Sequence, residues 1–179
     1  MYRLWLLTVL LLISSSCITT QASYTDEEGD QQLWGPIKTD QLQEAPYAEW
    51  YTASYGAYEP SDAILEWKEE LKAVKVQAFL GTWCSDSQEW VPQLVHLWTA
   101  LDLPQKKLQL IGLHNDGDLR KKGPNGEEEG LNIEYVPTFI FSLDGQEIGR
   151  IVEYPLTTLE GDVIKLAKQV REMQEKTEQ

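Results

Sequence analysis

The chain has 179 residues, 42% of them hydrophobic, which suffices for one domain with a core and is too short for two ordinary domains. Its formal net charge is −14 at pH 7, from 29 acidic and 15 basic residues. Because nucleic acids and anionic membrane surfaces attract clusters of Lys and Arg, this acidic balance argues against either as a partner. Two cysteines are too few for a disulfide framework.

The first residues have the pattern of a secretory signal. Arg3 precedes an apolar run over residues 4–13, and the small residues 14–16 follow it. The run is shorter than the about 20 residues that a membrane-spanning helix needs. We therefore predict a signal peptide over residues 1–16 and export of the mature protein.

Cys17 directly follows the small residues. It resembles the lipid-bearing cysteine of a bacterial lipobox, although Ser14 stands where an aliphatic residue is usual. The resemblance implies a lipid anchor on Cys17, with the domain held at a bacterial membrane in the cell envelope, facing the periplasm or the exterior. Cleavage after Ala22 is the alternative, and it would remove Cys17. In both cases Cys84 is the only free thiol expected in the mature protein.

Two segments precede the main domain. Residues 17–33 are polar and acidic without apolar periodicity, so we predict a flexible tether. Residues 34–60 predict a helical extension with an aromatic stripe, which suits either a platform for a sugar or partner, or a helix face packed on the domain. Packing on the domain is the commoner use of such a stripe. The rings at helical spacing are Tyr47, Trp50, Tyr51 and Tyr55.

Residues 61–179 predict one α/β domain. Strands that are parallel and joined by a helix, with an antiparallel hairpin at the other side of the sheet, make a mixed sandwich. Residues 115–130 predict a loop between the second strand and the hairpin. The expected elements are a capped helix after Ser61, a strand over 76–81, a helix from Cys84 to Leu101, a strand over 108–113, a hairpin of 135–142 and 146–152, and a helix over 156–173.

Cys84 follows Trp83 where the first core strand ends and a helix begins. At a helix N-terminus the backbone N–H groups and the helix dipole favour the thiolate, which is the nucleophilic form. A dithiol site needs Cys-x-x-Cys, because the second thiol attacks the mixed disulfide formed by the first; Ser87 occupies that second position. We therefore predict a nucleophile without a resolving partner. Ser87 is expected to hydrogen-bond the thiolate, and the charge of Asp86 is expected to oppose it.

The order of these motifs resembles the thioredoxin fold from about residue 61 to the C-terminus. Residues 81–87 and 149–155 are more narrowly similar to a group of bacterial thioredoxin-family proteins common in the Bacteroidota. The resemblance implies an α/β fold of the thioredoxin-like kind: a three-layer sandwich with a central mixed β-sheet and an N-terminal helical extension. The matching features are Trp83-Cys84 at a strand end, Pro92 eight residues later, Val136-Pro137-Thr138 before a strand, and Asp144-Gly145 in the hairpin.

The resemblance also implies roles for residues around Cys84. Pro137 is expected to follow a cis peptide bond and to act in catalysis beside Cys84. The Val136 backbone is expected to face the sulfur and to pair with an extended substrate. Further residues expected at the binding surface are Trp83, Asp86, Thr138 and Glu153.

Three positions depart from the family pattern. Ala78 stands where the family has a buried acid, so the usual proton acceptor is missing. Ser87 replaces the resolving cysteine. Glu153 replaces a glycine that lets partners approach, and its carboxylate is expected either to lie near Cys84 or to turn outward at a strand end.

Other site chemistry is missing from the sequence. Residues 114–118 offer oxygen ligands but lack the further spaced carboxylate of a Ca²⁺ loop, so we predict no metal site. No Ser/His/Asp arrangement, P-loop or dinucleotide glycine motif occurs, and we predict no cofactor.

Two functions fit these observations. The first is monothiol thiol–disulfide exchange by an exported, membrane-tethered protein. Its substrate would be a protein or small-molecule thiol or disulfide, and the substrate's second thiol or an external thiol such as glutathione would release the adduct. The second is a non-catalytic thioredoxin-fold module that binds a peptide or protein around Pro137. Ser87 and Ala78 favour the second function, and the retained Trp83-Cys84 pair favours the first.

Overall fold

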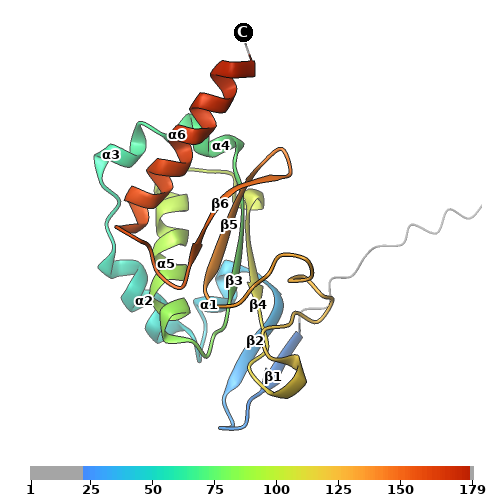
Figure 1. Cartoon of the computed structure of the whole chain (residues 1–179). Helices are drawn as coiled ribbons and strands as arrows, with labels where there is room; N and C mark the ends of the chain where they lie inside the picture. The colour runs from blue at the N-terminus through green and yellow to red at the C-terminus, as the bar shows by residue number, and fades with distance from the viewer. Residues whose placement is uncertain (1–21, 178–179) are drawn as a thin grey trace, which may run out of the picture.

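The computed structural model describes residues 22–177, and these form a mixed α/β fold. The predicted signal peptide and Cys17 lie outside the described residues. A six-stranded sheet in the order β1-β2-β4-β3-β5-β6 forms the centre of the fold (Figure 1). Within this sheet β3 and β4 are parallel, and the other neighbouring pairs are antiparallel. The α/β class and the central mixed sheet predicted from the sequence are confirmed.

The strands and helices follow the chain in this order. The strands are β1 (Ala22–Thr25), β2 (Gln31–Ile37), β3 (Lys75–Leu80), β4 (Leu108–Gly112), β5 (Thr138–Leu143) and β6 (Gln146–Val152). The helices are α1 (Thr39–Leu42), α2 (Ala48–Ala57), α3 (Asp62–Leu65), α4 (Lys68–Ala73), α5 (Ser85–Ala100) and α6 (Leu159–Thr177). No helix within residues 22–177 is long and apolar enough to cross a lipid bilayer.

Residues 22–33, the described part of the predicted tether, are ordered strands and a turn, so the tether prediction is wrong there. β1 and β2 form an antiparallel hairpin, and β2 then pairs with β4. Leu33 and Ile37 of β2 are buried in the main hydrophobic core. The pairing of β2 with β4 joins residues that are far apart in the sequence. The polar composition of residues 22–33 alone does not reveal this pairing, and it therefore predicted a flexible segment.

The predicted helix after Ser61 is divided into α3 and α4. Ser61 precedes α3, but its hydroxyl donates to Glu160 Oε2 at 2.5 Å instead of capping the helix. Ile64 and Leu71 are nevertheless fully buried, as the apolar spacing predicts.

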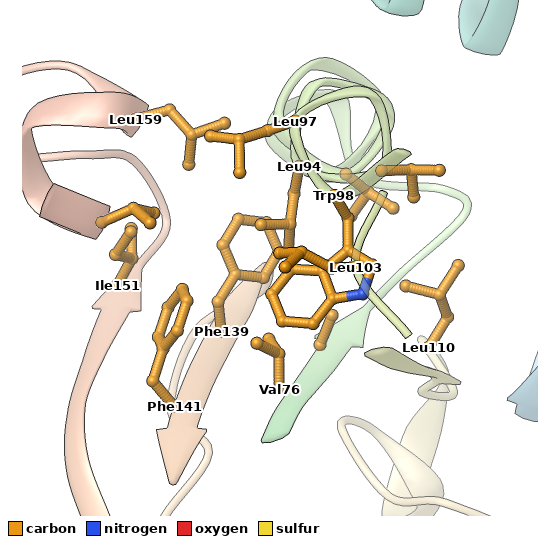
Figure 2. Close-up of a cluster of buried hydrophobic side chains, with 14 of the residues drawn as sticks. Val76, Leu94, Leu97, Trp98, Leu103, Leu110, Phe139, Phe141, Ile151 and Leu159 are labelled. Carbon is orange, nitrogen blue, oxygen red and sulfur yellow. The ribbon is translucent and has the colours of Figure 1, made fainter. Parts of the chain in front are cut away.

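The helices cover one face of the sheet. Side chains that alternate along the strands, such as Val76, Phe139 and Phe141, point to this face and form the main core with residues of all six helices. Figure 2 shows these three side chains packed beneath Leu94 and Trp98 of α5. Because α5 packs over β3 and β5, its N-terminus has a fixed position relative to the sheet.

The opposite face is covered by the connection between β4 and β5, residues 113–137, which runs on the other side of the sheet from α5 and α6 (Figure 1). Its regular structure is a 3-10 turn at Gly117–Leu119. Within the described residues this face is therefore covered mainly by irregular chain. Glycines and charged side chains interrupt the connection, so it has no apolar stripe that would make a helix. The second, smaller cluster on this face consists of Phe79, Ile111, Leu113, Val136 and Ile140.

Candidate functional site

Cys84 is the N-cap residue of α5. The buried strand β3 ends at Leu80, and the Cys84 N–H closes the turn by donating to the Gly81 carbonyl at 3.0 Å. The Cys84 carbonyl then accepts from the Gln88 N–H at 2.9 Å, which begins the helix. The partly exposed sulfur therefore lies at the positive end of a 16-residue helix, where an anion is stabilised.

The Cys84 side chain faces the Val136–Pro137 peptide. The Sγ atom donates to the Val136 carbonyl oxygen at 3.2 Å. The Val136–Pro137 bond is cis, as predicted. A carbonyl oxygen has no hydrogen to donate, so in this contact the thiol is the donor.

Ser87 does not hydrogen-bond the sulfur, so that prediction is wrong for the described structure. Its side chain is fully buried. Its Oγ atom accepts from the Gly81 N–H at 3.2 Å. Ser87 therefore stabilises the turn between β3 and α5 instead of contacting Cys84.

Trp83 holds the Cys84 loop against the 113–137 connection. Its Nε1 donates to the Leu113 carbonyl at 3.1 Å. The indole ring lies over Gly81, where an added Cβ would come within 2.4 Å of it, so this glycine allows the close approach. Trp83 and Cys84 both pack on the second cluster.

The remaining predicted binding residues differ in their exposure. Thr138 is 1% exposed and its hydroxyl donates to the Tyr135 carbonyl at 2.7 Å, so it stabilises the turn and is not on the surface. Asp86 is partly exposed in the first turn of α5. Three exposed apolar or aromatic side chains belong to the segments that meet at the Val136–Pro137 turn. Tyr135 precedes Val136, and Val152 and Tyr154 flank Glu153, whose N–H bonds the Pro137 carbonyl.

Glu153 lies directly after β6, beside the Val136–Pro137 turn. Its backbone N–H donates to the Pro137 carbonyl at 2.7 Å. Its φ of +61° lies in the left-handed region, which L-residues rarely adopt. The described residues show no hydrogen bond between its partly exposed carboxylate and Cys84. The structure thus places the Glu153 backbone at the edge of the site.

Ala78 is fully buried among the apolar side chains of the main core. Its methyl group supplies no proton acceptor at this position.

Sequence reasoning missed a polar network that holds the loop before Cys84. Thr82 Oγ1 accepts from the Leu33 N–H at 3.1 Å and donates to Gln32 Oε1 at 2.6 Å. Gln88 Nε2 donates to the Thr82 carbonyl at 2.8 Å. Thr82 and Gln32 are 50 residues apart, so no local pattern predicts their contact.

Comparison with known proteins leaves the function to be argued from this geometry. No protein-family model matches the chain, and neither the curated proteins nor the solved structures include a match.

Proposed function

We propose that the protein is thioredoxin-like and exchanges thiols and disulfides through Cys84 alone. The observation that carries the proposal is the position of a partly exposed sulfur at the N-terminus of α5, 3.2 Å from the Val136 carbonyl. The helix end favours a thiolate nucleophile. The backbone beside Pro137 offers hydrogen-bonding groups to an extended substrate.

The reaction proceeds by two exchanges. The Cys84 thiolate attacks one sulfur of the substrate disulfide; a new S–S bond forms to Cys84 as the substrate S–S bond breaks, and the other substrate sulfur leaves as a thiolate. Ser87 offers no second thiol, so a further thiol must attack the adduct. The substrate's own second thiol gives isomerisation. Reduction by glutathione takes a third exchange: one glutathione thiolate attacks the Cys84 sulfur of the adduct and releases the substrate as a dithiol, and a second glutathione then frees Cys84 and leaves as glutathione disulfide.

Two variants test this proposal. Cys84→Ala is expected to reduce the rate of disulfide exchange with glutathione to the uncatalysed background. Ser87→Cys creates a Cys-x-x-Cys pair and is expected to raise disulfide reductase turnover. Ser85→Ala, at an exposed neighbouring position, is the matched control and should leave the rate unchanged. Equal rates for the wild type and Cys84→Ala would eliminate catalysis by Cys84.

A second candidate, a peptide-binding module without catalysis, is favoured by buried Ser87 and Ala78, which supply neither a second thiol nor a proton acceptor, and by the thiol's hydrogen bond to the Val136 carbonyl only if the thiol stays protonated. That contact is lost when the thiol ionises. The rate of alkylation by iodoacetamide against pH separates the two functions. Alkylation that begins well below the about 8.5 at which a free cysteine ionises supports exchange, and alkylation only near that pH supports binding.

We also propose that the mature chain begins at a lipid-modified Cys17 and is held in the bacterial cell envelope. The support is the order of the apolar run, small residues and cysteine in the sequence. Mass spectrometry of the mature N-terminus is expected to show a diacylglyceryl Cys17. An unmodified chain beginning at Ser23 would contradict the lipid anchor.

A further inference from the structure

The connection between β4 and β5 contains a turn of four residues, Gly-Pro-Asn-Gly, at positions 123–126. The Gly126 N–H closes the turn by donating to the Gly123 carbonyl at 3.4 Å. Asn125 is exposed on this turn, so water reaches its side-chain amide. The exchange reaction proposed for Cys84 uses none of these residues.

Gly126 is required by the geometry of the turn. Its φ of +72° lies in the left-handed region, which favours glycine. A Cβ added to it would come within 2.7 Å of the Glu129 side chain. The fold therefore places a glycine directly after the exposed Asn125.

An asparagine followed by glycine is open to attack on its own side chain. Glycine has no Cβ to shield its backbone nitrogen, so that nitrogen can approach the side-chain carbonyl carbon of the preceding residue. The hydrogen bond from the Gly126 N–H, at 3.4 Å, is longer than the usual about 2.9–3.0 Å, so it restrains the nitrogen only weakly.

The two other asparagines of the chain are better protected. Asn115 is followed by Asp116, whose N–H donates to His114 Nδ1 at 3.0 Å. Asn132 is followed by Ile133, whose branched Cβ crowds its own nitrogen. Both provide comparison sites within the same molecule.

Glu127 holds the Asn125 amide in the present turn. Asn125 Nδ2 donates to Glu127 Oε1 at 2.9 Å, and the Asn125 N–H donates to Glu127 Oε2 at 3.0 Å. A carboxylate in place of the amide has no hydrogen to donate and carries the same charge as Glu127. Loss of the amide nitrogen would therefore replace an attractive contact with a repulsive one.

We propose that Asn125 is a site of spontaneous deamidation, and that this modification opens the turn of residues 123–126. The Gly126 nitrogen attacks the side-chain carbonyl carbon of Asn125. A new C–N bond closes a succinimide ring as the bond from that carbon to Nδ2 breaks, and ammonia leaves with the proton that Gly126 has lost. Water then opens the ring at either carbonyl, which gives aspartate or isoaspartate.

Incubation of the purified protein at pH 8 and at pH 6, followed by peptide mass spectrometry, tests the modification. Peptides that contain Asn125 are expected to gain the mass given by replacement of NH₂ with OH, and to gain it faster at pH 8, because base removes the Gly126 proton. Asn125→Gln is the matched control: its longer side chain closes a ring less readily, so it should gain mass more slowly. No gain at Asn125, or an equal gain at Asn115 and Asn132, would overturn the proposal.

Asn125→Asp supplies one product directly and tests its effect on the turn. We expect the amides of residues 123–131 to exchange about tenfold faster, since loss of a hydrogen bond lowers the free energy of local opening. Glu127→Gln in the Asn125→Asp background places a donor opposite the new carboxylate and is expected to slow the exchange again. Unchanged exchange in Asn125→Asp, or no recovery in the double variant, would overturn the opening of the turn.

Discussion

At the scale of single residues, Glu153 combines an unfavourable backbone conformation with a position beside the Val136–Pro137 turn. Its φ is +61°, and its N–H is bonded to the Pro137 carbonyl. An L-residue in the left-handed region costs about 1 kcal/mol, which glycine would avoid. The Glu153 side chain therefore occupies this position at a backbone cost, and the two substitutions below test what its carboxylate does.

Glu153→Gly relieves the backbone strain but adds flexibility to the unfolded chain, so we expect the free energy of unfolding to change by no more than about 1 kcal/mol. Urea denaturation measures it. A loss well beyond this value would show that the Glu153 side chain makes stabilising contacts.

Glu153→Gln keeps the strained backbone and removes the charge. A carboxylate near the sulfur disfavours the thiolate, so we expect faster alkylation of Cys84 at neutral pH. Slower disulfide exchange at an unchanged alkylation rate would instead indicate proton transfer by Glu153. If neither rate changes, Glu153 is an ordinary surface carboxylate and the site reduces to Cys84 and the Val136–Pro137 turn.

At the scale of elements, Thr82 joins the β1–β2 hairpin to the loop that carries Cys84. The residue is 3% exposed, and its hydroxyl bonds both the Leu33 N–H and Gln32. Gln32 Nε2 in turn donates to Asp26 Oδ2 at 2.7 Å. The hairpin therefore depends on one hydroxyl for a set of buried hydrogen bonds.

Thr82→Val leaves the Leu33 N–H and the Gln32 amide without this partner. We expect a loss of about 1–3 kcal/mol in the free energy of unfolding and faster hydrogen exchange of the Leu33 amide. Ser142→Ala, which removes a hydroxyl that donates at 3.3 Å, is the control and should have a smaller effect. An unchanged exchange rate at Leu33 would show that the hairpin is held by strand pairing alone.

An ion pair joins α4 to α6. Glu70 Oε1 accepts from Arg171 Nε at 2.6 Å, while the buried Oε2 has no partner among the described residues. Burial alone would raise the pKa of Glu70, but the hydrogen bond and charge of Arg171 bring it below its ordinary value. Because the folded-state pKa is the lower one, the pair stabilises the fold above the unfolded-state pKa of about 4.3, and that stability is lost as the pH falls through the folded-state pKa.

Arg171→Met is expected to lower the free energy of unfolding more at pH 7 than at pH 3, because a larger share of Glu70 is protonated at the lower pH and the pair is weaker there. Urea denaturation at the two pH values measures the difference. Lys168→Met is the matched control, since its ammonium lies over the same Trp67 ring, 5.7 Å from its centroid, and it changes the net charge equally. Equal losses by Arg171→Met at both pH values would contradict the role of the ion pair.

At the scale of the whole molecule, the two faces of the sheet have different covers. Phe139 and Ile140 are neighbours on β5 and point to opposite faces, Phe139 into the main core and Ile140 into the second cluster. The main core contains side chains from every helix, whereas the second cluster holds the Cys84 loop. We therefore expect the free energy of unfolding to depend mainly on the face with the main core, and the environment of the Cys84 thiol to depend on the face with the second cluster.

Phe139→Ala is expected to cost about 3–5 kcal/mol of unfolding free energy, and Ile140→Val about 0.5–1.5 kcal/mol. Only Ile140→Val is expected to raise the alkylation rate of Cys84 under conditions where the chain is fully folded, because it loosens the cluster beneath the sulfur. Urea denaturation and alkylation by iodoacetamide test the two effects. A faster alkylation rate in Phe139→Ala alone would reverse this assignment.

Regular apolar spacing allowed much of the fold to be predicted. The strand before Cys84, the helix after it and the hairpin around Asp144-Gly145 follow patterns that adjacent residues settle. The β1–β2 hairpin was not predicted, because β2 joins the sheet by pairing with β4, which is far away in the sequence. A loop was predicted over residues 115–130, but its packing on the second face of the sheet was not, since the connection has no regular apolar spacing.

The candidate site was predictable to a similar extent. The resemblance implied that the Val136 backbone faces Cys84, and in the structure Sγ lies 3.2 Å from the Val136 carbonyl oxygen. The partner of Ser87 was not predictable, because a hydroxyl on the first turn of a helix has several groups within reach and the turn geometry selects the Gly81 N–H. Burial of Thr138 likewise follows from the position of β5 inside the sheet.

The packing of Cys84 on the second cluster links the chemical state of the sulfur to the order of the 113–137 connection. Thermodynamic linkage is reciprocal. If the ordered connection makes modification of the thiol less favourable, modification makes ordering of the connection less favourable by the same free energy. An adduct on Cys84 is thus expected to change the packing of Tyr135, which adjoins Val136. The Tyr135 ring centroid lies 5.0 Å from the Lys121 ammonium. We therefore expect the order of the connection to differ between the free and the occupied thiol.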